Sequence, residues 1–123
     1  MKKYTREELK EALQVVSSTI SNCEKMQPKF AEGTSQHTLL KNRIKALYLS
    51  KSLLIEENIM DKYTKEELIA ALDPVSSIIR KCEKAQLKFA EGVAQHTRLK
   101  NIIKTMYISK SLIVDEISKM ETY

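Results

Sequence analysis

Apolar positions in this chain recur at steps of three and four residues, the spacing of one face of an α-helix. One such stripe begins after Thr5 and a second begins after Thr64. Each stripe is interrupted by a single glutamine. The pattern predicts two long amphipathic helices. Their stripes consist of Leu9, Leu13, Val16, Ile20, Cys23, Gln27 and Phe30, and of Leu68, Leu72, Val75, Ile79, Cys82, Gln86 and Phe89.

Both predicted helices carry start and stop signals. The segments 5–8 and 64–67 read Thr-x-Glu-Glu, which fits a capping box. Gly33 and Gly92 follow the stripes, where a left-handed glycine ends a helix. We therefore expect helices of about 25–28 residues. Pro28 and Pro74 fall inside them, and we expect both prolines to bend the helix without ending it.

A second, more apolar helix follows each of the first two. It is expected from Ser35 or Thr38 to about Asn58, and its counterpart carries a similar stripe from Leu99 to Val114. The apolar arc covers more than half of the helix circumference. A helix this apolar needs two neighbours, and one hairpin supplies only one.

The two helix pairs are copies of one unit. Residues 4–57 (repeat 1) align without a gap to residues 63–116 (repeat 2) at an offset of 59, with 34 of 54 positions identical. The repeat predicts a single all-α domain over residues 1–123, a four-helix up-down-up-down bundle of two hairpins with internal pseudo-two-fold symmetry. An alternative is that the middle helices fuse through Glu56–Thr64, which contains no glycine or proline, and give a swapped dimer.

The composition limits the classes of protein to which this chain can belong. The apolar fraction is 42%, the charged fraction is 30% and the net charge is +5. These values are typical of a globular protein, and no apolar run is long enough to cross a membrane. The start of the chain lacks the apolar segment of a secretory signal. With two cysteines and no CxxC pair, a reduced cytoplasmic protein without disulfides is expected.

One candidate site is the block Gln36-His37-Thr38, repeated as Gln95-His96-Thr97. In an up-down-up-down bundle both hairpin turns lie at one end, so the two blocks would lie side by side. Beside the helix N-termini they would suit an anion or an acidic group of a partner. The simpler interpretation is that each block only forms a turn and its caps.

A second candidate is the polar face of the second helix in each repeat. Its members in repeat 1 are Thr38, Lys41, Lys45 and Ser52, matched in repeat 2 by Thr97, Lys100, Lys104 and Ser111. Arg43 and Arg98 are expected nearby. Such a face suits phosphate contacts, although no helix-turn-helix spacing, arginine-rich segment or aromatic platform accompanies it. Lysines on an outer helix face otherwise serve only solvation.

No constellation for catalysis, a cofactor or a metal is found in the sequence. Cys23 and Cys82 lie on the core stripe and are expected to be small buried side chains, since zinc needs converging ligands. Lys51 and Lys110 lie among apolar residues and are expected to extend their ammonium groups to water. No paired carboxylates, phosphate loop or HExxH motif occurs. The chain is therefore expected not to be an enzyme.

The sequence favours a non-enzymatic protein–protein interaction module that acts as an adaptor, regulator or inhibitor. The alternative is nucleic-acid binding through the lysine-bearing faces. Ile69 and Ile102 replace the repeat-1 residues Lys10 and Arg43 without new polar partners. They predict an apolar surface for a partner or for self-association. The competing interpretation is that the bend at Pro74 turns them inward.

Overall fold

The structure is a computed structural model that describes residues 3–55, 58–59 and 61–121. Within these residues it contains four α-helices, a short 3-10 helix and no strand. The helices are α1 (Arg6–Met26), α2 (Ser35–Leu54), α3 (Lys65–Gln86) and α4 (Ala94–Glu121), and the 3-10 helix is η1 (Gln27–Lys29). The predicted all-α class is confirmed. No helix of the described part is long and apolar enough to span a membrane.

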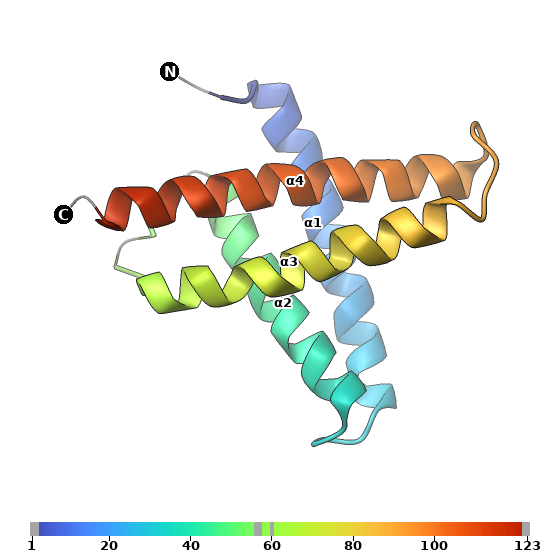
Figure 1. The fold of residues 1–123 in the computed structure, drawn as a ribbon, viewed down its shortest axis with the longest axis horizontal. Helices are drawn as coiled ribbons and strands as arrows, with labels where there is room; N and C mark the ends of the chain where they lie inside the picture. Colours follow the sequence, from blue (N-terminus) through green and yellow to red (C-terminus); the bar gives the residue numbers. More distant parts are fainter. Residues whose placement is uncertain (1–2, 56–57, 60, 122–123) are drawn as a thin grey trace.

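The four helices form two antiparallel hairpins, α1 with α2 and α3 with α4, which lie in two layers and cross steeply (Figure 1). α2 contacts both helices of the other hairpin, whereas within the described residues α1 contacts α4 but not α3. The α1–α2 turn and the α3–α4 turn therefore lie at different ends of the molecule (Figure 1). The expectation that both turns share one end is wrong, because the hairpins cross rather than run along one axis.

The predicted helix starts are confirmed by their caps. Thr5 and Thr64 each accept the backbone N–H of the glutamate three residues on, and Glu8 and Glu67 each accept the N–H of the capping threonine. Thr34 caps α2 by accepting the N–H of His37. These are local bonds between residues three apart, which explains why the sequence alone predicts them.

The predicted helix ends need correction. α1 ends at Met26, and Pro28 lies in η1 instead of bending a longer helix. α3 ends at Gln86, one residue beyond the position that matches Met26, although it has no proline there. Both helices therefore end several residues before the glycines. Gly33 and Gly92 do adopt positive φ, at 92° and 95°, but within the loop. In contrast, α3 continues through Pro74, as expected.

The middle helices are separate. α2 ends at Leu54 and α3 begins at Lys65. Between them, the carbonyl of Ile59 accepts the backbone N–H groups of Lys62 and Tyr63, and the Ile59 side chain is buried. This turn rules out the fused middle helix for the chain as described; Glu56, Glu57 and Met60 of that segment, with Met1, Lys2, Thr122 and Tyr123, lie outside the described residues.

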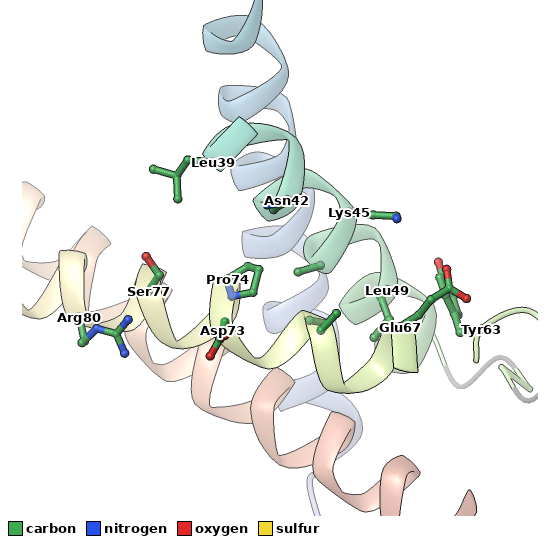
Figure 2. Close-up of a pocket in the computed structure, with 13 residues that line it drawn as sticks. Leu39, Asn42, Lys45, Leu49, Tyr63, Glu67, Asp73, Pro74, Ser77 and Arg80 are labelled. Atoms are coloured by element: carbon green, nitrogen blue, oxygen red, sulfur yellow. The ribbon is translucent and has the colours of Figure 1, made fainter. Parts of the chain in front are cut away.

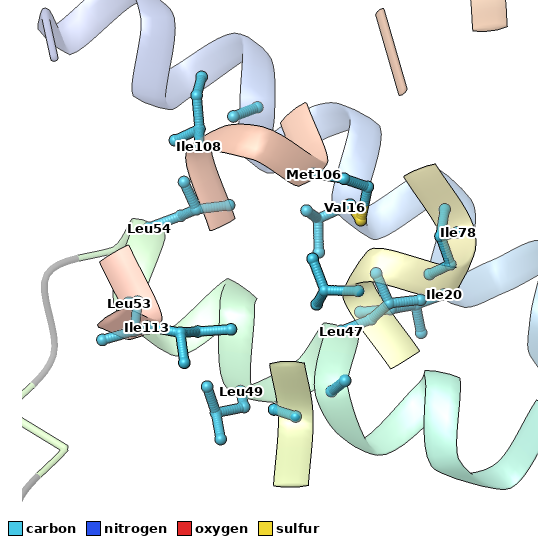
Figure 3. Close-up of a cluster of buried hydrophobic side chains, with 14 of the residues drawn as sticks. Val16, Ile20, Leu47, Leu49, Leu53, Leu54, Ile78, Met106, Ile108 and Ile113 are labelled. Atoms are coloured by element: carbon cyan, nitrogen blue, oxygen red, sulfur yellow. The ribbon is translucent and has the colours of Figure 1, made fainter. Parts of the chain in front are cut away.

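The core lies where the hairpins cross, and all four helices contribute to it (Figure 3). Equivalent residues of the two repeats are buried together: Val16 with Val75, and Leu47 with Met106, each at 0% exposure. Small buried residues such as Ala46, Ser50 and Ser109 let the helices approach closely. Burial at this crossing explains why the second helix of each repeat has such a wide apolar arc.

Candidate functional site

A groove of about 700 Å³ lies between α2 and α3. It lies where the two hairpins meet (Figure 2). Its floor contains Ala46, Leu49 and Ala71, which are all buried in spite of lining it. Two alanines at facing positions leave space that larger side chains would fill, and this accounts for the hollow. The other lining residues are Leu39, Asn42, Lys45, Tyr63, Glu67, Ala70, Asp73, Pro74, Ser77 and Arg80.

The groove has two different ends. Tyr63 and Glu67 lie at one end, Ser77 and Arg80 lie at the other, and Pro74 lies between them (Figure 2). Charged side chains of both signs line the groove around an apolar floor. Chemically, an apolar floor with charges around it can hold an amphipathic group and orient it.

Pro74 shapes the middle of the groove. It stands inside α3 and has no backbone N–H. The carbonyl of Ala70 therefore receives no helical hydrogen bond from residue 74, and both residues line the groove. The carbonyl oxygen of the exposed Ala70 can therefore accept a hydrogen bond from a ligand. Repeat 1 lacks this feature because Val15 occupies the position that matches Pro74.

Arg43 is the clearest departure from the sequence-based expectation. The sequence predicts it near the lysine-bearing face, but it is only 7% exposed and packs between the hairpins. Its Nη2 donates to the Ser77 hydroxyl at 3.0 Å, and its Nε has no acceptor among the described residues. Arg43 lies beside the wide apolar arc of α2, and the α3–α4 hairpin that packs on this arc also covers Arg43. Ser52, which was expected on the same polar face, is also buried.

The two Gln-His-Thr blocks are not brought together. Each lies in the first turn of its own helix, α2 or α4, at the separate hairpin turns (Figure 1). Gln36, Thr38, Gln95 and Thr97 are exposed, while His37 and His96 are half-buried. The N–H of His37 is bound by Thr34, and the carbonyl of His96 accepts from Gln86 Nε2 at 3.4 Å. The paired site beside a symmetry axis is therefore not formed, and these contacts suit a turn with caps.

The lysines of the predicted polar faces are exposed as expected. They are Lys41, Lys45, Lys100 and Lys104. Acidic residues accompany two of them. Lys45 and Glu67 both line the groove. The pKa of the Glu8 carboxyl is lowered mainly by its hydrogen bonds with Thr5, and the nearby Lys104 lowers it further. The basic faces are thus partly neutralised.

Ile69 and Ile102 have different surroundings. Ile69 is 48% exposed on α3, so Pro74 does not turn it inward. Ile102 is half-buried and packs against the core. The predicted surface that includes both residues is therefore formed only around Ile69.

Both cysteines are buried and free, as expected from their place on the core stripes. Burial raises the pKa of the Cys23 and Cys82 thiols, and the charge of Arg43 acts against this on both. No group of three or more His, Cys, Asp or Glu side chains suited to a metal occurs in the described part of the chain. A hydrogen bond from the Tyr48 hydroxyl to Glu24, 3.0 Å long, raises the pKa of Tyr48.

Compared with known proteins, the chain matches no family model, no curated protein and no solved structure. Function must therefore be argued from the geometry. Sequence reasoning found Lys45 but missed the rest of the groove. A usable signal was present, because many lining positions differ between the repeats, among them Leu39 (Arg98 in repeat 2) and Ala70 (Glu11 in repeat 1).

Proposed function

We propose that this protein is a non-enzymatic protein–protein interaction module, an adaptor, regulator or inhibitor, and that the α2–α3 groove receives an apolar segment of its partner. The groove itself is the observation that carries the proposal. It combines a buried apolar floor with charged side chains around it, and its volume of about 700 Å³ accommodates several side chains. An amphipathic helix laid into such a groove would bury its apolar face there.

The proposal includes an origin by duplication, with internal pseudo-two-fold symmetry and an up-down course within each hairpin. Matching contacts between the repeats support it. Lys3 donates to Ser111 at 2.7 Å, and the equivalent Lys62 donates to the equivalent Ser52 at 3.5 Å. A hairpin that once dimerised with a second copy would exchange contacts in this way. In this proposal the α2–α3 face and the α4–α1 face are equivalent in origin, and only the α2–α3 face has become a binding site.

Nucleic-acid binding through the exposed lysines is the second candidate. Lys41, Lys45, Lys100 and Lys104 are open to a ligand. The acidic groups beside Lys45 and Lys104 weaken attraction to phosphates, which is why we rank this function lower. A reducing compartment such as the cytoplasm is part of either proposal, because Cys23 and Cys82 are free thiols.

The test replaces two groove residues with their counterparts in the other repeat, Leu39→Arg and Ala70→Glu. Both side chains are exposed, so the substitutions alter the groove without opening the core. Proteins retained by the wild-type chain from an extract of the source cells are compared by quantitative mass spectrometry with those retained by the double variant. A purified candidate partner is then titrated directly, and we expect its binding to fall at least about tenfold in the double variant.

A matched control is Met26→Arg with Ala31→Glu, which places the same side chains at exposed positions at the end of α1 and in the loop that follows it. The control should keep partner binding. Equal binding by wild type, groove variant and control would disprove the groove as the site. Tight binding of random duplex DNA with a steep loss of affinity in salt would instead favour the nucleic-acid function.

A further inference from the structure

Arg43 is a buried cation that has no carboxylate partner among the described residues. None of the ion pairs among the described residues includes it, and its Nε lacks an acceptor there. The whole Arg43 residue is only 7% exposed and its Nε is buried, so the side chain loses much of its hydration, and this is costly unless an anion or several acceptors compensate for it. The matching position in repeat 2 holds Ile102, so the fold itself does not require a cation here.

The Arg43 guanidinium reaches the groove through Ser77. Because the Ser77 oxygen accepts the hydrogen bond from Arg43, its own hydroxyl hydrogen is free to point to another acceptor. Ser77 lines the groove, and Arg80 lies at the same end (Figure 2). This end of the groove therefore offers one hydroxyl donor and one exposed guanidinium, with a second guanidinium behind the hydroxyl.

The charge at this end suits a single negative charge. Arg80 at this end and Arg43 behind Ser77 are positive, and Asp73 beside Pro74 in the middle of the groove is negative, which leaves one net positive charge (Figure 2). A carboxylate matches this balance better than a phosphate dianion does. Arginine also binds carboxylates through two parallel hydrogen bonds.

We propose that the Ser77–Arg80 end of the groove binds the carboxylate of an aspartate or glutamate in the partner's segment, with an apolar neighbour of that residue on the floor formed by Ala46, Leu49 and Ala71. This inference rests on the proposed function and specifies its partner as an acidic, amphipathic peptide segment. Ser77 and Arg80 contact the carboxylate, and Arg43 acts through Ser77.

The experiment pans a displayed library of random dodecapeptides on the full-length protein. Peptides that bind wild type but not the Leu39→Arg, Ala70→Glu variant are kept as groove ligands. We expect these peptides to share an aspartate or glutamate beside an apolar residue. Each selected peptide is then compared with its Asn or Gln analogue, and loss of the charge should weaken binding about tenfold.

Two variants connect this preference to the site. Arg80→Ser and Arg43→Ile install the repeat counterparts Ser21 and Ile102, and both should bring the ratio of acidic to amide peptide affinity close to one. That ratio does not change when a variant merely lowers the fraction of folded protein. Arg98→Leu removes an exposed cation outside the groove and should keep the tenfold ratio.

Groove ligands without a common acidic residue would overturn the carboxylate site and leave the proposed function intact. An unchanged ratio in both arginine variants would do the same. A library that yields no groove-dependent peptide would overturn this inference and count against the proposed function as well.

Discussion

The two joins between the hairpins, α2 with α3 and α4 with α1, use equivalent parts of the repeat but differ in character. Both place a lysine of the second helix near a capping-box glutamate, Lys45 with Glu67 and Lys104 with Glu8. At the α2–α3 join the buried small residue is Ala46, whereas the α4–α1 join has the larger Thr105. The groove lies at the join with the smaller side chain.

Charge differs between the joins as well. The exposed apolar residues Leu39 and Ala70 of the groove correspond to Arg98 and Glu11 at the other join. The buried Arg43 corresponds to the half-buried Ile102. The groove thus combines residues that the two copies share, such as Ser77, with residues in which they differ, and only the latter distinguish the two joins.

The largest expected effect tests whether both joins belong to one core. Leu47→Ala and Met106→Ala truncate equivalent, fully buried side chains at the crossing. Each should lower the free energy of unfolding by about 2–5 kcal/mol. Urea denaturation followed by circular dichroism should show one transition in both variants. Two separate transitions would mean that the hairpins fold independently.

The next effect compares the prolines. Val15→Pro places the α3 proline at the equivalent site in α1, where it would remove a helical hydrogen bond and should cost about 3 kcal/mol. Pro74→Val restores that bond in α3, but it also gives the unfolded chain more freedom, so a gain of only about 1 kcal/mol is expected. Thermal denaturation measures both. A loss of stability in Pro74→Val would show that the packing around α3 requires the proline at this position.

A smaller effect is expected from exchanging Arg43 and Ile102. Arg43→Ile removes a buried cation that pairs with no carboxylate of the described residues, and it should raise the free energy of unfolding by about 1–2 kcal/mol. Ile102→Arg should lower it, since that position packs against the core. Chemical denaturation at neutral pH provides both values. If Arg43→Ile destabilises the protein, the hydrogen bond from Arg43 to Ser77 stabilises the fold by more than the desolvation of Arg43 costs.

The smallest effect concerns the thiols, which should behave alike in the two repeats. Their folded-state pKa values are raised by burial, so the folded protein holds these protons more tightly than the unfolded chain. The stabilisation is complete below the ordinary thiol pKa of 9.0 and is lost as pH rises through the folded-state value. Urea denaturation at rising alkaline pH should show this loss.

Cys23→Ala and Cys82→Ala isolate the thiol contribution. The pKa of Tyr48 is also raised, so its contribution to stability is likewise lost as pH rises. Each cysteine variant is therefore compared with wild type across the pH series. Each should reduce the alkaline loss of stability by a similar amount. A pH dependence unchanged in both variants would show that the thiols titrate as in the unfolded chain.

Features that depend only on neighbours along the chain could be predicted from the amino-acid sequence. The capping boxes at Thr5 and Thr64, the positive φ of Gly33 and Gly92, the buried cysteines and the all-α class are all confirmed. Each follows from hydrogen bonds between residues three or four apart, or from a stripe with helical spacing. Such signals are complete within one helix or one turn.

Only the tertiary structure decided how the hairpins lie on one another. The steep crossing separates the two Gln-His-Thr blocks, covers Arg43 and leaves the α2–α3 groove open (Figure 1). α2 has an apolar arc wide enough for several partner orientations, and the one adopted depends on side chains of another hairpin such as Ala71 and Ser77. Periodicity tells which face of a helix is buried, but the angle between two buried faces depends on how their side chains interlock.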